Sequence, residues 1–369
     1  MSNMDRCPKC LLPANYPGIR IENGACNYCK KYSKPIVDYK GEKRLLEDIG
    51  AILAKYPDRN TEYDVAVGFS GGMDSTWLLY YATRQLNLRV LAVTMRHKFM
   101  PKHTYENIEN IAKLLNVPVV YFDNPYLDEY AAYFIKNWAY HPTVQGLIGF
   151  CTGCRYGLSK LLYQEVAKRN IHILLSGLNQ YESTEYRVHS VMLNPNKPSK
   201  LGFALGYGKE LAANPHYLAS PGKIAFQLKE HMSFKELAKM RRASKKNAAE
   251  GLDYLGITEI YPFYSYINWN RKEATDVLEK LGWQKGSDAQ QEWRSDCEVG
   301  LIRQYYYRRL LGFNDQEVKR AHMLRNHQLT VDDPGKIEET DPSVIRRILK
   351  DSFDLDFDEI EQRIERLNS

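Results

Sequence analysis

The stretch DVAVGFSGGMDST, residues 64–76, decides the fold of this chain. Residues 64–69 are a short and mostly apolar run, which predicts a buried strand. Gly71 and Gly72 follow, and because glycine has no side chain the backbone there can approach an anion and present successive N–H groups to it. A helix expected from Thr76 adds the positive end of its dipole. The stretch therefore predicts a strand, a phosphate-binding loop and a helix in succession.

Polar side chains complete this phosphate-binding pattern. The hydroxyl groups of Ser70, Ser75 and Thr76 can donate to phosphate oxygens. We expect Asp74 to cap the helix or to help hold a magnesium ion that bridges the phosphates. The loop lacks the lysine of a Walker A motif, so cleavage at the γ-phosphate is not implied.

The spelling S-G-G-x-D-S resembles the loop of the PP-loop family, which includes GMP synthetase, argininosuccinate synthetase and the tRNA thiolases. The resemblance implies that the loop binds the pyrophosphate of ATP, that ATP is cleaved between its α- and β-phosphates, and that AMP is transferred to a substrate oxygen. It also implies catalytic roles for Asp74 and Ser75. The nucleotide-binding residues that it implies are Gly68, Ser70, Gly71, Gly72, Asp74, Ser75, Thr76, Thr94 and Gly177.

Further apolar runs at residues 90–94, 117–122 and 171–176 predict strands, with helical stretches between them. Strands that alternate with helices of this length predict an α/β fold, a doubly wound parallel sheet with helices on both faces. The PP-loop resemblance implies the HUP-like version of this fold. Ligands of such sheets bind at the carboxyl ends of the strands, which is where the glycine-rich loop falls.

Composition divides the chain into three regions. Residues 1–36 carry four cysteines and little apolar material, residues 60–260 hold the alternating pattern, and residues 261–369 are mainly helical in pattern. Between residues 188 and 221 the chain is rich in Pro, Asn, Gly and Lys, which predicts a long active-site loop or lid.

Four cysteines form two C-x-x-C pairs near the N-terminus, Cys7 with Cys10 and Cys26 with Cys29. Two such thiolate pairs can close a tetrahedral site around zinc, and the metal would fold a segment too small to hold a core of its own. The sequence therefore predicts a structural zinc ribbon. Two redox pairs or unused thiols are the alternatives.

Three cysteines remain, Cys151 and Cys154 in a third C-x-x-C pair and Cys297 alone. Three thiolates could bind a [4Fe–4S] cluster with one open iron, or a second zinc with one open position. They could also provide a catalytic thiol with a resolving partner. Thiols that only pack near one another are the remaining alternative.

Six motifs are spread along most of the chain: C-P-K-C-L-L-P at 7–13, N-G-A-C-N-Y-C at 23–29, the loop at 70–75, C-T-G-C at 151–154, Y-I-N-W-N at 266–270 and S-D-C-E-V-G at 295–300. Together they resemble the motifs of the N-acetyl sugar amidotransferases of bacterial surface-polysaccharide synthesis. The resemblance implies that AMP activates an acetamido oxygen and that ammonia, supplied by a separate glutaminase, replaces it to give an amidine. Its substrate would be a free or nucleotide-linked N-acetyl sugar. Asn268 and Asn270 stand where acidic residues are expected.

A sulfur-transfer enzyme is the second hypothesis. Some tRNA thiolases resemble this chain in combining an N-terminal zinc site, S-G-G-x-D-S and a three-cysteine iron–sulfur cluster, to which Cys151, Cys154 and Cys297 would correspond. Sulfide would then replace ammonia, and RNA would be the partner. The late Asp-Cys motif favours the sugar family.

Charge and hydropathy indicate where in the cell the protein lies. The chain has 369 residues and a formal net charge of +6, which suits a nucleotide, a nucleotide-linked sugar or RNA equally well. No stretch approaches eighteen uninterrupted apolar residues, and the N-terminus lacks the apolar region of a secretory signal. We therefore expect a cytoplasmic protein with no membrane partner.

Overall fold

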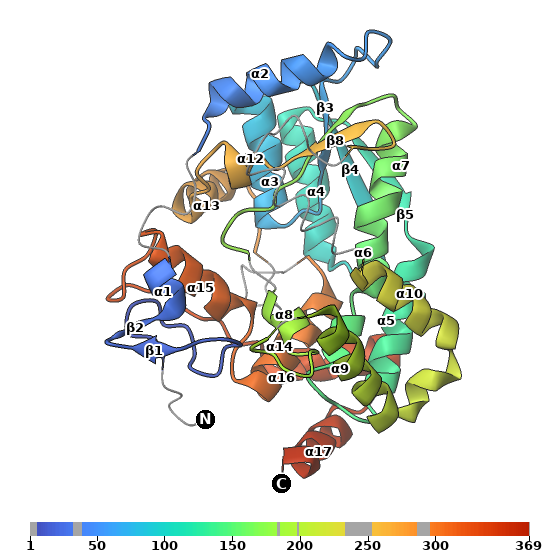
Figure 1. Cartoon of the computed structure of the whole chain (residues 1–369). Helices are drawn as coiled ribbons and strands as arrows, with labels where there is room; N and C mark the ends of the chain where they lie inside the picture. The colour runs from blue at the N-terminus through green and yellow to red at the C-terminus, as the bar shows by residue number, and fades with distance from the viewer. Residues whose placement is uncertain are drawn as a thin grey trace.

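A six-stranded sheet forms the centre of the computed structural model, which describes residues 6–31, 39–182, 185–197, 199–232, 253–285 and 296–368 (Figure 1). The strand order is β5-β4-β3-β6-β8-β7, in which the first five strands are parallel and β7 is antiparallel to β8. The strands are β3 (Val65–Gly68), β4 (Val90–Arg96), β5 (Val119–Asp123), β6 (Ile173–Leu175), β7 (Asp253–Tyr254) and β8 (Ile257–Ile260).

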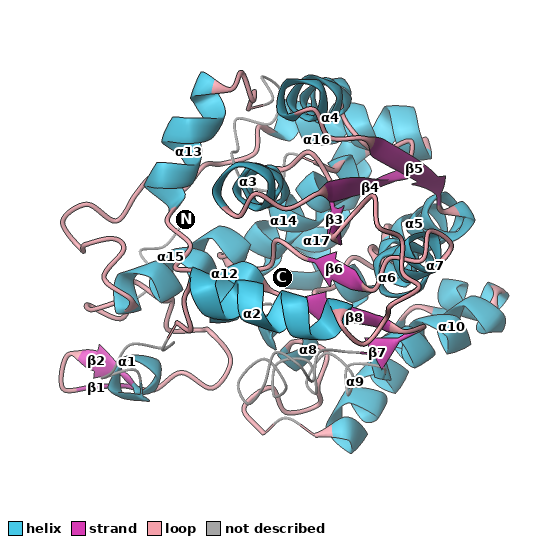
Figure 2. Cartoon of the chain, turned by 90° about the horizontal axis from the view of Figure 1, so that it is seen from above, coloured by secondary structure: helices cyan, strands magenta, loops and turns pink. Residues whose placement is uncertain are grey.

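Both faces of this sheet are buried. Ala66 and Leu91 belong to the core on one face, whereas their neighbours Val67 and Ala92 belong to the core on the other, as the alternation of a strand requires. Helices α3 and α4 cover one face and α5, α6 and α7 the other (Figure 2). The predicted doubly wound α/β sheet is confirmed. These helices are α3 (Met73–Tyr80), α4 (Lys102–Leu115), α5 (Pro125–Trp138), α6 (Thr152–Tyr156) and α7 (Leu162–Ala167).

The order of the strands fixes where a ligand can bind. From β3 the chain adds β4 and β5 on one side, and then returns to add β6 and β8 on the other. The carboxyl ends of β3 and β6 therefore flank the point at which the strand order reverses, the usual binding crevice of an open α/β sheet. Residues 70–72 follow β3 and residues 176–182 follow β6, so both segments lie at this crevice.

Helices make up most of the C-terminal part, as predicted, and they return to the rest of the molecule. Helix α15 reaches the N-terminal segment, where Arg325 Nη1 lies 3.3 Å from Cys10 Sγ (Figure 1). The same helix reaches the loop after β3, as described below. The helices are α12 (Pro262–Ser265), α13 (Arg271–Lys280), α14 (Glu298–Leu311), α15 (Asp315–Arg325), α16 (Pro342–Phe353) and α17 (Phe357–Asn368).

The remaining elements lie in the N-terminal segment, in helix α2, which packs near β6, and in the connections between the strands and helices named above. Those of the N-terminal segment are β1 (Ile21–Glu22), β2 (Ala25–Cys26) and α1 (Asn27–Lys31), and α2 (Glu42–Leu53) follows. The others are the π-helices η1 (Tyr81–Gln85) and η3 (Gly157–Leu161), the 3₁₀-helices η2 (Gly146–Gly149) and η4 (Pro215–Ala219), and the α-helices α8 (Glu185–His189), α9 (Lys200–Ala213) and α10 (Pro221–Met232).

Two features of the fold differ from the sequence prediction. The segment 188–221, predicted to be a loop, contains the 14-residue helix α9. Its three glycines lower helix propensity, but Gly206 serves packing, because a Cβ there would lie 1.8 Å from Val191 O. Strand β8 was not predicted; it forms a hairpin with β7 whose turn residues Leu255 and Gly256 have positive φ.

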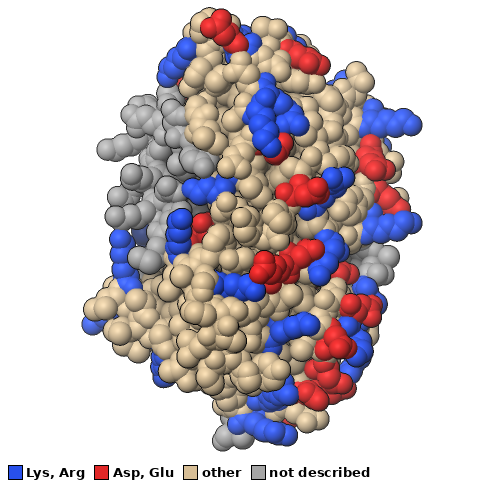
Figure 3. Space-filling view, turned by 90° about the vertical axis from the view of Figure 1, so that its right-hand side faces the viewer, with Lys and Arg blue, Asp and Glu red and all other residues tan. Residues whose placement is uncertain are grey.

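Two further features of the described residues are the distribution of charged side chains on the surface and the hydropathy of the helices. On the face drawn in Figure 3, basic and acidic side chains of the described residues are interspersed rather than gathered by sign. No helix in the described part of the chain combines the length and the apolar character needed to cross a bilayer.

Candidate functional site

Hydrogen bonds within the loop hold the predicted phosphate-binding residues in place. Ser70 N donates to Ser75 Oγ over 3.2 Å, and the Oγ atoms of these two serines lie 3.1 Å apart. The hydroxyl of Thr76 donates to Gly72 O over 2.8 Å, and that of Ser75 to the same oxygen over 3.1 Å. The loop is thus shaped by its own side chains. Phosphate contacts from these hydroxyls stay a prediction.

Two of the predicted glycines stand where no side chain fits. Gly71 has φ +76°, and a Cβ there would lie 2.8 Å from Thr104 O of α4. A Cβ on Gly177 would lie 3.0 Å from Asp74 O, so the segment after β6 packs directly against the start of α3. The loop is also held from outside, because Trp283 Nε1 donates to Gly71 O over 3.0 Å.

Thr94 lies beside the loop as predicted, at the carboxyl end of β4. Its hydroxyl is fully buried and donates to Phe69 O over 2.7 Å, which ties β4 to the residue before the loop. Gly68 is the last residue of β3 and pairs with Val93. The adenine contacts implied for Gly68 and Thr94 stay predictions, whereas their positions at the crevice are established.

Asp74 lies in a charged group that the sequence did not reveal. The buried Lys319 Nζ of α15 lies 3.8 Å from Asp74 Oδ2 and 4.0 Å from Glu182 Oε1, and it sits 4.3 Å from the centre of the Trp269 ring. Burial raises the pKa of Asp74 to about 7; Lys319 opposes this shift and Glu182 adds to it. Two carboxylates thus share one ammonium at the first turn of α3.

Glu182 could have been predicted near the loop from the sequence, whereas Lys319 could not. Glu182 follows a predicted strand by a few positions, so its place near the crevice could have been inferred. Lys319 lies 245 residues after Asp74 on a helix whose side chains are buried all round, and no local motif marks it. Only the packing of α15 against the sheet brings it to the loop.

A magnesium ion fits this donor set. Mg²⁺ in nucleotide sites is usually held by one or two carboxylates together with phosphate oxygens and water. Asp74 and Glu182 are two carboxylates beside a loop suited to phosphate, and Asp74 Oδ1 is buried. These two residues would hold the ion, and the ion would neutralise charge on the phosphates.

The late cysteine motif comes to the same crevice. A Cβ on Gly72 would lie 3.4 Å from Asp296 Oδ2, which places Asp296 against the loop. Burial raises the pKa of the neighbouring Cys297 thiol well above its usual range, and the charges of Cys154, Cys151 and Asp296 add to this. The three cysteines predicted as one group are therefore electrostatic neighbours.

Two arginines, the buried Arg303 and the half-buried Arg155, accompany these cysteines. Arg303 Nη1 of α14 lies 2.6 Å from Cys151 Sγ. Burial lowers the pKa of Arg155 to about 10, and the charge of Cys151 opposes this. Among the described residues, the group of thiols found close enough together to hold a metal is the N-terminal one. Their predicted metal or sulfur chemistry stays a hypothesis.

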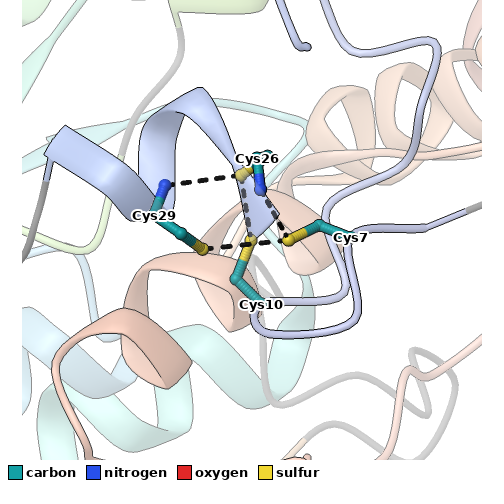
Figure 4. A group of neighbouring side chains, drawn as sticks. All are labelled: Cys7, Cys10, Cys26 and Cys29. Carbon is teal, nitrogen blue, oxygen red and sulfur yellow. Dashed lines mark hydrogen bonds between the residues drawn. The ribbon is translucent and has the colours of Figure 1, made fainter. Parts of the chain in front are cut away.

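The four N-terminal cysteines converge on one point (Figure 4). All four Sγ atoms lie within 4.8 Å of one another, with Cys7 and Cys29 3.8 Å apart and Cys10 and Cys26 3.7 Å apart. A tetrahedron with Zn–S bonds of about 2.3 Å has edges of about 3.8 Å. The group could hold zinc or an iron–sulfur centre, and these two separations match a single tetrahedral ion.

Hydrogen bonds support thiolate character in this group. Backbone N–H groups of Cys26 and Cys29 donate to Cys7 Sγ over 3.3 Å and Cys26 Sγ over 3.4 Å. The side-chain hydrogen bond between Cys10 and Cys26 lowers the pKa of Cys26 and raises that of Cys10. Such donors stabilise the charged sulfur that a metal requires.

Replacing Cys10 with serine should remove the metal from this segment. One lost ligand opens a closed site, and the short segment then lacks the cross-link that holds it. We expect bound zinc to fall from about one equivalent per chain to near none, with a lower Tm, in metal analysis and thermal unfolding. Lys9→Ser, an exposed neighbour in the same turn, is the control. Full zinc in Cys10→Ser would contradict the assignment.

Comparisons with known proteins agree with a PP-loop nucleotide site. Residues 45–141 match the family model described as NAD synthase. This segment contains β3, the loop, α3 and α4, and it supports an ATP-utilising enzyme of the PP-loop class. Comparison with curated proteins found no match.

Solved structures with distant similarity include two synthetases and one tRNA thiolase. The chain is 15% identical to an NH3-dependent NAD synthetase from Campylobacter jejuni (67% of this chain, 97% of that one, TM-score 0.28). It is 12% identical to NMN synthetase from Francisella tularensis (81% and 95%, TM-score 0.34). It is 16% identical to the U34-tRNA thiolase NcsA from Methanococcus maripaludis, solved with its [4Fe-4S] cluster (96% and 100%, TM-score 0.32).

Proposed function

We propose that this chain is an AMP-forming amidotransferase that adenylates the acetamido oxygen of an N-acetyl sugar and replaces that oxygen with nitrogen from ammonia. The observation that carries the nucleotide half is the loop 70–75 at the reversal of strand order, with Asp74, Glu182 and Lys319 beside it. The sugar half is supported by the cysteine and Asp-Cys motifs, which bring Asp296 to the loop.

The chemistry runs in two displacements. The acetamido oxygen attacks the α-phosphorus of ATP, the bond to the bridging oxygen of the β-phosphate breaks, and pyrophosphate leaves with the electron pair. Charge accumulates on that pyrophosphate, and the N–H groups of the loop and the Lys319 ammonium would offset it. Ammonia then adds to the activated carbon, AMP leaves with its oxygen, and loss of a proton gives the amidine.

The roles of the individual residues follow from this chemistry. Ser70, Gly71, Gly72 and Ser75 would cradle pyrophosphate, and Asp74 with Glu182 would hold Mg²⁺, which when bound neutralises phosphate charge. No residue need act as a covalent nucleophile, since the substrate oxygen and ammonia fill that role.

We further propose the surroundings of this reaction. A structural zinc in residues 1–36 would anchor α15, which carries Lys319, through the contact between Arg325 and Cys10. A separate glutaminase would supply ammonia, the sugar would be free or nucleotide-linked, and the pathway would be surface-polysaccharide synthesis in the cytoplasm. Residues 60–260 would form the ATP domain and 261–369 a helical region that completes its site.

Thiolation of RNA is the second candidate, and one observation favours it. Cys151, Cys154 and Cys297 influence one another beside the loop, and Arg303 contacts Cys151. Thiolate ligands of an iron–sulfur cluster, or a sulfur-carrying thiol, would suit such a place. Sulfide would then take the part of ammonia in the second displacement.

Product analysis tests the amidotransferase. With ATP, Mg²⁺, ammonium chloride and a panel of UDP-linked N-acetyl sugars, we expect equal amounts of pyrophosphate and AMP, and a sugar product carrying an amidine. Release of phosphate alone would overturn AMP transfer altogether. Protein purified without oxygen separates the two candidates: about four irons with sulfide per chain would favour thiolation, and zinc alone would favour amidation.

A further inference from the structure

A second buried polar group lies where η4 contacts both α5 and α9, close to residues 143–146. Its central side chains are Glu210 and Tyr217, which are 4% and 1% exposed. Asn214, also 1% exposed, stands between them in the chain. None of these residues belongs to the ATP loop or to either cysteine group.

The side chains of Glu210 and Asn214 each make one hydrogen bond to a neighbouring residue. Thr143 Oγ1 donates to Glu210 Oε2 over 2.7 Å. Asn214 Nδ2 donates to Asn137 O over 2.8 Å, which leaves its Oδ1 facing elsewhere. Glu210 Oε1, Asn214 Oδ1 and Tyr217 Oη are all buried without a hydrogen-bond partner among the described residues. Two are acceptors only, so a donor or a cation is missing.

Gly146 shows that two of these oxygens meet at one place. A Cβ on this residue would lie 2.9 Å from Tyr217 Oη and 3.0 Å from Glu210 Oε1. It would also lie 2.6 Å from Trp138 Cδ1, so no side chain fits there. A carboxylate oxygen and a phenol oxygen thus approach the same spot beside a backbone that has to be glycine.

In the part of the chain that the structure describes, no positive charge is shown to balance that of Glu210. Apart from burial, the bond from Thr143 is the influence on its pKa among the described residues, and no lysine, arginine or histidine of that part of the chain contributes. The titratable groups that its charge affects are Tyr207 and Tyr217. Burial raises the pKa of Glu210 to about 7, so at pH 8 a buried carboxylate needs compensation.

We propose that Glu210 Oε1 and Tyr217 Oη bind one monovalent cation, potassium or ammonium, beside Gly146, with Asn214 Oδ1 as a further oxygen of the same segment. Oxygen donors suit a hard cation, and a single carboxylate neutralises a single charge. A divalent ion would leave a net charge buried among aromatic side chains, which is costly. The site is independent of the proposed function.

Thermal unfolding at pH 8 and constant ionic strength tests the site. In potassium or ammonium chloride at about ten times the dissociation constant, the Tm should rise by about 2 °C over its value in choline chloride. In Glu210→Gln, which keeps the size of the side chain, the four chlorides of potassium, ammonium, sodium and choline should give one Tm. Glu109→Gln, exposed on α4, should keep the wild-type response.

Two further measurements keep the test decisive. Tyr217→Phe removes only the phenol oxygen and should weaken the response to cations, so it replaces Glu210→Gln if that variant does not fold. Titration of each salt shows whether potassium or ammonium acts at the lower concentration. One Tm for wild type in all four salts would overturn the proposal, as would a cation response that survives in both variants. A rubidium-soaked crystal should show an anomalous peak beside Gly146.

Discussion

Asp74→Asn should lower the rate of ATP-dependent pyrophosphate release by about 10²–10³-fold, the usual cost of losing one group that stabilises charge in a transition state. Asparagine keeps the size and the helix position of the side chain but cannot offer a second charged oxygen to Mg²⁺. Asp123→Asn is the matched control: it removes an exposed carboxylate from the end of the edge strand β5. We expect that variant to retain full activity.

The same variant should change how stability depends on pH. The folded pKa of Asp74 is about 7, above the value of about 3.9 for a free aspartate. The folded protein therefore holds more protons between these values, and ionisation of Asp74 lowers the free energy of unfolding as pH rises from about 4 to 7. Urea unfolding without Mg²⁺ should show this decline in wild type and a weaker one in Asp74→Asn. Full pyrophosphate release by Asp74→Asn would remove its assigned role.

The sequence predicted the parts of the site that are contiguous in the chain. Residues 64–76 combine a buried run, two glycines and a helix start, so strand β3, the loop and α3 could each be read locally. The four N-terminal cysteines also converge as their spacing predicted. In both cases the backbone of one short segment sets the geometry, and residue type reports it directly.

Long-range packing accounts for what the sequence did not predict. Lys319 and Trp283 reach the loop from the C-terminal half, and nothing in their own neighbourhoods marks them. The sequence did not predict helix α9, because a segment with several glycines is more typical of a loop than of a helix. In the structure, Gly206 is needed because the helix packs closely against Val191. Propensity describes a segment in isolation, whereas packing can require a small residue within a helix.

Lys319→Gln should lower pyrophosphate release by about 10²-fold, because it removes a positive charge that lies beside both Asp74 and Glu182 while keeping a side chain of similar length. The side chain of Lys319 is 3% exposed, so we do not expect water to replace the lost charge. Lys272→Gln, on the exposed surface of α13, is the control for loss of a lysine charge.

The pH profile separates a catalytic from a structural role for Lys319. Lys319 opposes the rise in the pKa of Asp74, so without it that pKa should climb further above 7. Asp74 must be ionised to hold Mg²⁺, and the acidic limb of kcat/KM should therefore move to higher pH in Lys319→Gln. Lys319→Arg keeps the charge and should restore part of the activity and the position of that limb. A helix that needed Lys319 only for packing would lose Tm in Lys319→Gln but keep the wild-type limb, and that result would exclude electrostatic coupling between α15 and the ATP loop.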